Sequence, residues 1–212
     1  MNIADIHSHV LRADAIVNCY PDSFCPQSGY CYSVGIHPWY VQTADVDAQE
    51  ELLRTAAASL QVVAIGEAGL DKLAGGFADK QEDVFRFQCL LAEEVQKPLI
   101  VHLVKAVDEL LRIRSAVKPT VPWILHGFRG GPRLAEELLH HGMYISFGMK
   151  FNAATMRTVP RDRMFLETDD SGADIHSIYK GAADAMGISE EELRDSLHRN
   201  IRNVFFKGKD IL

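Results

Sequence analysis

The sequence predicts a single α/β domain with the architecture of a (β/α)8 barrel. Short apolar runs typical of parallel strands alternate with longer segments in which apolar residues recur every three to four positions. Several short runs are apolar throughout, as expected of strands that are covered on both faces. A chain of 212 residues suits one such domain. Because no repeat, linker or low-complexity segment interrupts it, we predict one domain over residues 1–212.

Eight strands and six helices are predicted in chain order. The strands are 2–7, 15–19, 30–36, 62–66, 99–102, 123–126, 144–147 and 164–167. The helices are 44–60, 81–96, 106–117, 132–141, 174–186 and 189–206. The fourth helix begins at Pro132, which suits a first helical position, and ends before Gly142. The last opens with the capping box Ser189-Glu190-Glu191-Glu192.

The beginning of the chain does not fit a regular barrel. Only about five residues separate His9 from the second strand, and about ten separate Cys19 from the third. A parallel crossover usually needs a dozen or more residues. We therefore predict that the first two crossover helices are missing and that the barrel is distorted or incomplete between strands 1 and 3. The second strand is either irregular or antiparallel, or the barrel is incomplete there.

Composition limits the classes of partner. The formal charge is -7, from 22 basic and 29 acidic residues, so the protein does not attract nucleic acid over long range. A phosphodiester substrate remains compatible, since metal ions would supply local positive charge. The sequence lacks an apolar run of the ~18 residues that span a membrane and a signal-peptide pattern at its start. We expect a cytoplasmic protein, without membrane contact or an obligate protein partner, that is a monomer.

Ligand-type side chains collect at the strand ends. In parallel α/β folds the chemistry gathers at the C-terminal ends of the strands. The side chains there are His7, His9, His37, Glu67, His102, His126 and Asp169. His7 and His9 lie two residues apart, so on a strand they point to the same face. An imidazole or carboxylate at nearly every strand end predicts a metal centre.

The mixture of donors indicates which metals fit. Imidazole and carboxylate without thiolate suit Zn, Mn, Fe or Ni, and Mg less well. Six ligands are too many for one catalytic ion that keeps an open position. Two ions bridged by one carboxylate fit better. Glu67 is the candidate for the bridge, because its strand lies in the middle of the strand order. Such a pair can activate water and stabilise a displaced phosphate or acyl group.

Six motifs in order resemble those of the TatD-type metal-dependent hydrolases, which are amidohydrolase-like barrels commonly described as deoxyribonucleases. The motifs are Asp5-Ile-His7-Ser-His9, Val34-Gly-Ile-His37-Pro38-Trp39, Ile65-Gly66-Glu67-Ala-Gly69-Leu70-Asp71, Pro98-Leu-Ile-Val-His102, His126-Gly-Phe128-Arg-Gly130 and Leu166-Glu167-Thr168-Asp169. Asn200 also resembles the family's late asparagine. The resemblance covers nearly the whole chain.

The resemblance implies a dinuclear site and a reaction. One ion would be held by His7, His9, Glu67 and Asp169, and the second by Glu67, His102 and His126. Asp169 would orient or deprotonate the attacking water, and Glu67 would bridge the ions. The implied reaction is phosphodiester hydrolysis of DNA by a metal-bound hydroxide. His37 matches a family motif without being a ligand there, and is either a contact to substrate or to a ligand, or a structural turn histidine.

The sequence departs from the family pattern around the predicted mouth. Asp170-Ser171-Gly172 replaces a small residue and proline, and Leu103-Val104-Lys105 replaces a serine-arginine pair. Lys105 and Arg129 follow strand ends and are candidates for a substrate phosphate, with surface placement as the alternative. Hydrolysis of an amide, ester or lactone is the second functional hypothesis. A non-catalytic metal-binding barrel is the third.

Overall fold

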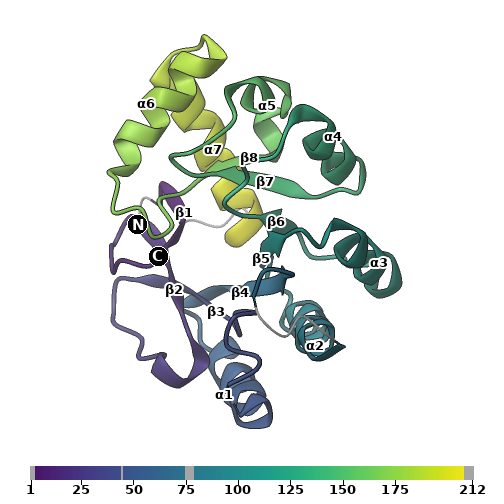
Figure 1. The fold of residues 1–212 in the computed structure, drawn as a ribbon. Coiled ribbons are helices and arrows are strands. Elements are labelled where there is room, and N and C mark those ends of the chain that lie inside the picture. Colours follow the sequence, from purple (N-terminus) through teal and green to yellow (C-terminus); the bar gives the residue numbers. More distant parts are fainter. Residues whose placement is uncertain (1–2, 44, 75–78, 208–212) are drawn as a thin grey trace. The chain divides into compact units, whose positions relative to one another are not determined.

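Eight strands form one sheet in the described part of the chain, residues 3–43, 45–74 and 79–207 of a computed structural model. The strand order follows the sequence from β1 to β8 (Figure 1). The strands are β1 Asp5–Ser8, β2 Ala15–Cys19, β3 Cys31–Val34, β4 Val62–Asp71, β5 Leu99–Val104, β6 Trp123–Leu125, β7 Tyr144–Phe147 and β8 Met164–Leu166. Every pair with a defined register is parallel. The predicted (β/α)8 class is confirmed; residue 2, the predicted start of the first strand, lies outside the described residues.

All six predicted helices are present. The helices are α1 Val46–Ala57, α2 Asp79–Val95, α3 Val107–Val117, α4 Pro132–His140, α5 Ala153–Thr158, α6 Ile175–Met186 and α7 Glu190–Phe205. The Ser189 hydroxyl caps α7 by accepting from the Glu192 N–H at 3.1 Å. The predicted start of the first helix, residue 44, lies outside the described residues. Among the α-helices of the described residues, α5 alone was not predicted. Within the described ranges, no helix is both long and apolar enough to cross a membrane.

The first two crossover helices are missing, as predicted. Residues 9–14 connect β1 to β2 without a helix, and residues 20–30 contain only the 3-10 turn η1 Pro21–Ser23. The antiparallel alternative for the second strand is wrong, because β2 pairs parallel to β1 with Asp5 opposite Ala15 and Ser8 opposite Val17. A four-residue strand rises about 13 Å, and six extended residues reach about 20 Å. Residues 9–14, in an extended conformation, are therefore long enough to run back along β1 and connect it to the start of β2 without a helix.

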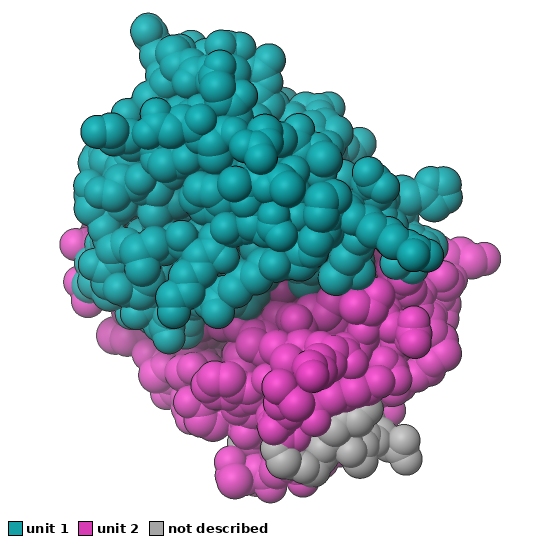
Figure 2. Space-filling view, turned by 45° about the horizontal axis from the view of Figure 1, so that its top comes forward, with its two compact units in different colours: residues 1–17, 124–212 teal, residues 18–123 magenta. Residues whose placement is uncertain are grey.

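The described chain divides into two compact units, coloured separately in Figure 2. Unit 1 comprises Met1–Val17 and Ile124–Leu212, and unit 2 comprises Asn18–Trp123. In unit 1, α6 and α7 pack on β8, and α4 packs on β7. In unit 2, α2 packs on β4, α1 contacts β3 and β4, and α3 packs on β5. The single domain over residues 1–212 stays a prediction.

Glycines allow β4 to approach its neighbouring strands closely in unit 2. Gly69 lies opposite His102 on β5, and a Cβ at Gly69 would lie 1.9 Å from the His102 carbonyl oxygen. On the β3 side, a Cβ at Gly35 would lie 2.7 Å from the backbone of Gly66. Real side chains do not tolerate such distances. The small residues around Glu67 therefore fix how near its backbone lies to the strand that carries His102.

Candidate metal centre

The first cluster of ligand-type side chains lies in unit 1. We call His7, His9, His126, Glu167 and Asp169 the Asp169 cluster. His7 is fully buried in β1, and His9 follows that strand and is exposed. Their Nε2 atoms lie 3.6 and 3.5 Å from the same Asp169 Oδ1. The His-x-His spacing thus directs two imidazoles to one carboxylate, as the alternation of side chains along a strand predicts.

The backbone around Asp169 is tied to the end of β1. The Asp169 N–H donates to the His7 carbonyl at 2.9 Å, and the His9 N–H donates to the Asp169 carbonyl at 3.2 Å. Asp169 itself has a φ of +54°, a left-handed conformation that aspartate tolerates better than most residues. Burial raises the pKa of the Asp169 carboxyl, but hydrogen bonds from His7 and His9 outweigh it and hold the pKa well below its usual range. The carboxylate is therefore ionised.

A buried carboxylate orients His126 in the same cluster. His126 follows β6 directly, and its Nδ1 lies 3.2 Å from Glu167 Oε1. The same Glu167 oxygen accepts from the Gly127 N–H at 2.6 Å, and the Ser146 hydroxyl donates to the other oxygen. Glu167 is acceptor-only when ionised, so the Nδ1–H donates to it and Nε2 carries the lone pair through which a metal would bind.

Asp5 links the ends of β1 and β8 within the Asp169 cluster. It is completely buried, and it accepts from the Thr168 hydroxyl at 2.6 Å, the Thr168 N–H at 3.1 Å and the His7 N–H at 3.2 Å. Burial raises the pKa of Asp5 to about 6, against the lowering effect of these bonds. Asp5 therefore positions His7 and the segment before Asp169 together.

The second cluster lies in unit 2. We call His37, Glu67, Asp71 and His102 the Glu67 cluster. Glu67 lies within β4 with 4% of its surface exposed, and its Oε1 lies 2.7 Å from His102 Nδ1 and 3.1 Å from His37 Nε2. The Glu67 N–H donates to Asn18 Oδ1 at 2.8 Å. Glu67 is therefore fixed through its backbone as well as its carboxylate.

A backbone donor defines the protonation of His37. The Trp39 N–H donates to His37 Nδ1 at 3.1 Å, so this nitrogen acts as an acceptor. The proton of the neutral ring is then on Nε2, which faces Glu67. His37 therefore donates to the Glu67 carboxylate and orients it. This geometry favours the interpretation that His37 contacts the proposed metal ligand Glu67 over the interpretation that it is only a structural turn histidine.

His102 gives the test of whether a cation fits the Glu67 cluster. Its Nε2 lies 3.3 Å from Asp71 Oδ2, which also accepts from Trp39 Nε1 at 2.6 Å. Burial raises the pKa of Asp71, but these and backbone hydrogen bonds lower it overall, so Asp71 is an acceptor. The Nε2–H of neutral His102 donates to it, which leaves the Nδ1 lone pair 2.7 Å from the Glu67 carboxylate. His37 Nε2, the protonated nitrogen of that ring, lies 3.3 Å from His102 Nδ1 and 3.1 Å from Glu67 Oε1, so its N–H is shared between these two acceptors. A metal ion could be held by the same two acceptors, so the donor set fits a cation.

The predicted ligands are thus brought together within each unit. Within unit 1 one ligand atom from each of His7, His9 and Asp169 lies within 4.8 Å of the others, as do those of His126, Glu167 and Asp169. Within unit 2 the same holds for His37, Glu67 and His102. These sets suit a divalent metal ion, which imidazole and carboxylate bind well.

A cavity of about 200 Å³ adjoins the Asp169 cluster in unit 1. Arg129 and Lys150 line it together with Glu167, Asp169 and Asp170. Arg129, a candidate for contact with a substrate phosphate, thus lies beside the Asp169 cluster, and that contact stays a prediction. Lys105, by contrast, is exposed after β5 and does not line this cavity. Its assignment to substrate stays a prediction.

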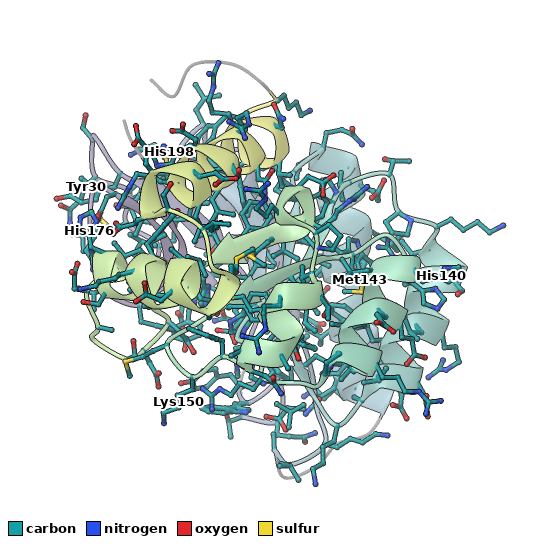
Figure 3. All side chains as sticks on the ribbon, turned by 90° about the horizontal axis from the view of Figure 1, so that it is seen from above. Tyr30, His140, Met143, Lys150, His176 and His198 are labelled. Carbon is teal, nitrogen blue, oxygen red and sulfur yellow. The ribbon has the colours of Figure 1, made fainter. Side chains whose placement is uncertain are left out.

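Four other histidines, His140, His141, His176 and His198, lie outside both clusters. His140 ends α4, and His176 and His198 belong to α6 and α7. Figure 3 shows His140 on the opposite side of the view from His176 and His198. None of them joins a group of ligand-type atoms among the described residues.

Comparisons with known proteins are consistent with this chemistry. A family model described as TatD related DNase matches residues 25–206. The chain belongs to this family. The TatD-related chain is 34% identical over 148 residues to the uncharacterized metal-dependent hydrolase YabD of Bacillus subtilis, covering 65% of this chain and 57% of YabD. It is 35% identical over 161 residues to the 3'-5' ssDNA/RNA exonuclease TatD of a Pantoea species, a match that covers 66% of this chain and 58% of the relative.

A solved structure shows the shared fold. The TatD-related chain matches the crystal structure of YJJV, a TatD homolog from Escherichia coli, with a TM-score of 0.79 and 21% identity over 92% of this chain and 88% of that one. The chain spans less than two thirds of the length of the two curated relatives above.

Sequence reasoning missed three residues that support the clusters. Glu167 was seen only as part of a motif, although it orients His126. The sequence did not indicate a role for Asn18 or Ser146, because single amide and hydroxyl side chains are common on strands. Of the three, only Glu167 could have been predicted from the sequence, since a carboxylate next to a buried strand requires a partner.

Proposed function

We propose that this TatD-related chain hydrolyses phosphodiester bonds of DNA with two divalent metal ions. The proposed ligands are His7, His9, Glu67, His102, His126 and Asp169, with Glu67 shared between the ions. The order of the family's motifs along the chain supports this assignment, and so do the donor sets within each unit. The identity of the ions is one of Zn, Mn, Mg, Fe or Ni. We further expect a cytoplasmic monomer.

The side chains of the two clusters have different roles in the proposed reaction. When bound, the ions supply positive charge that lowers the pKa of an attacking water and neutralises a phosphate. Asp169 is ionised and partly exposed, so it can orient that water and accept its proton. Glu167 and Asp71 hold His126 and His102 in one tautomer. His37 orients Glu67.

The cavity beside Asp169 is the observation that carries the choice of substrate. Arg129 and Lys150 line the same cavity as Asp169. Both have basic side chains, and Arg matches the geometry of phosphate oxygens. A lactone or amide does not need two cations there. Glu167, Asp169 and Asp170 line the cavity as well, so the two cations, together with bound metal ions, would have to offset these carboxylates. With the ions bound, the cavity would favour an anionic phosphodiester over the substrates of the second hypothesis.

Hydrolysis of a labelled single-stranded oligonucleotide tests the proposal. We expect activity with added divalent metal, loss of activity with excess chelator, and recovery when metal is restored. Asp169→Asn should lower the rate about 100-fold or more, because it removes the proton acceptor. Asp162→Asn, which changes an exposed aspartate in the 3-10 turn η2 Arg161–Arg163, should leave the rate unchanged.

A panel of DNA, RNA, an amide and a lactone separates the alternatives. Turnover of the lactone or amide with no turnover of any nucleic acid would replace our proposal by the second hypothesis. No turnover of any substrate by metal-loaded protein would favour the non-catalytic barrel. Unchanged activity in Asp169→Asn would remove the role given to that carboxylate.

A further inference from the structure

A second cavity, of about 320 Å³, lies in unit 2 on the segment that replaces a crossover helix. Its wall includes Tyr20, Asp22, Ile36, His37, Tyr40 and Gln49. These residues come from the turn η1 that follows β2, the segment after β3 and the first turn of α1. Only His37 also belongs to the Glu67 cluster. The cavity therefore borders that cluster without using any proposed metal ligand.

Aromatic rings form much of this wall. The rings of Tyr20 and Tyr40 lie 4.9 Å apart at an interplanar angle of 72°, and those of His37 and Tyr40 lie 6.1 Å apart at 65°. Tyr20 is half-buried and Tyr40 is 45% exposed. Such rings offer a face to a planar aromatic ligand. Base–aromatic stacking of this kind is how single strands are held without base pairing.

The polar groups on the rim select against a phosphate. Gln49 Nε2 donates to Asp22 Oδ2 at 3.3 Å, and both side chains line the cavity. A carboxylate repels a phosphate, whereas it accepts hydrogen bonds from amino groups. Burial and the neighbouring Tyr40 raise the pKa of Tyr20, so its phenol stays protonated and neutral. The site therefore suits an uncharged aromatic ligand with hydrogen-bonding edges.

We propose that this cavity binds one base of a nucleic-acid strand, stacked on the face of one of the rings of Tyr20 and Tyr40 and bordered by the other, with its polar edge toward Asp22. Bases that carry an exocyclic amino group (cytosine, adenine and guanine) should be preferred over thymine and uracil, because the single ring N–H of thymine and uracil is flanked by two carbonyl oxygens that the acceptor-only Asp22 would repel. The proposal rests on the proposed function, whose substrate it deepens. His37 joins the cavity to the Glu67 cluster, so the bound base would adjoin the group that His37 orients.

Calorimetric binding of mononucleotides tests this site apart from catalysis. The probes are dCMP, dTMP and 2-deoxyribose 5-phosphate, none of which contains a phosphodiester bond. We expect dCMP to bind more tightly than dTMP, and both more tightly than the baseless sugar phosphate. Tyr20→Leu and Tyr40→Leu should each raise the Kd of dCMP about tenfold and leave that of the sugar phosphate unchanged. Asp22→Asn should reduce the preference for dCMP over dTMP.

Tyr30→Leu is the matched control, because Tyr30 belongs to unit 2 but does not line the cavity. Tyr40 and Asp22 are exposed, so their variants test the site even where Tyr20→Leu fails to fold. Equal Kd values for dCMP and the sugar phosphate, or unchanged dCMP binding in both Tyr40→Leu and Asp22→Asn, would overturn the proposal. Base-dependent binding without oligonucleotide hydrolysis would overturn the proposed function alone. Hydrolysis without base-dependent binding would overturn this site alone.

Discussion

At the scale of single residues, buried carboxylates select which imidazole nitrogen carries the lone pair through which a metal would bind. Glu167 accepts from His126 Nδ1, and Asp71 accepts from His102 Nε2. The two histidines are therefore held in opposite tautomers. Ligands that are held in this way lose little freedom when a metal binds, and the carboxylate makes the imidazole more basic.

Glu167→Gln tests this effect. The amide keeps the shape of the side chain but removes its charge, and it places a donor where Ser146 or Gly127 now donates. We expect Zn²⁺ or Mn²⁺ to bind about 10 to 100 times more weakly in a calorimetric titration. Glu136→Gln, an exposed change on α4, is the control. Equal affinity in the two variants would show that Glu167 does not position His126.

Glu93 gives a pH dependence that is separate from the metal clusters. Burial raises its pKa, but the Thr120 hydroxyl (2.6 Å) and the N–H groups of Thr120 and Val121 (3.0 Å each) outweigh burial and lower it. A lowered folded-state pKa stabilises the protein above the unfolded value of about 4.3, and this stabilisation is lost as the pH falls through the folded value.

Urea unfolding at several pH values checks this dependence. Glu93→Gln should lower the free energy of unfolding by about 1 kcal/mol at pH 7, a value reduced for the partial exposure of the side chain. The difference from the wild type should shrink below about pH 4. Glu94→Gln, on the same helix and paired with Arg54 at the surface, is the control. A difference that does not change with pH would contradict the role of the Glu93 charge.

At the scale of elements, the contact between β4 and β5 depends on a residue without a side chain. Gly69→Ala would place a methyl group 1.9 Å from the His102 carbonyl. We expect a loss of about 3 kcal/mol or more in the free energy of unfolding, because the obstacle is backbone. The midpoint of urea unfolding measures this loss.

Gly181→Ala is the matched control for that change. Gly181 lies within α6, where the nearest atom to a new Cβ is 3.9 Å away on Phe151. Alanine should be neutral or stabilise the helix by about 0.5–1 kcal/mol. Equal effects of the two substitutions would contradict the close approach of β4 and β5.

Element prediction from the sequence succeeded where periodicity was long and failed where it was short. Caps and apolar spacing located α4 and α7 to within a residue or two. Helix α5 has six residues, fewer than two turns, so no period can be recognised; its start is marked by the Asn152 cap alone. β4 extends to Asp71, five residues past its predicted end, since pairing with β5 continues through Gly69 and Leu70.

At the scale of the whole molecule, the sequence predicted the ligand-type residues because parallel strands end on one side of a sheet. It could not predict which carboxylate faces which imidazole nitrogen. That choice depends on side-chain partners such as Ser146 and Asn18, which lie on other strands. The aromatic cavity was not predicted either, because Tyr20 and Tyr40 are brought together only by the absence of a crossover helix.

Unit 1 is made from both ends of the described chain, and this arrangement has a consequence for synthesis on the ribosome. Unit 2 is continuous in the sequence, from Asn18 to Trp123, so all its residues are translated before most of unit 1. His7 and His9 are translated before unit 2, and Asp169 follows 160 residues after His9. At roughly 5–20 residues per second, that interval lasts on the order of ten to thirty seconds. During this time the nascent chain does not yet contain Asp169, the carboxylate that contacts both histidines in the folded protein.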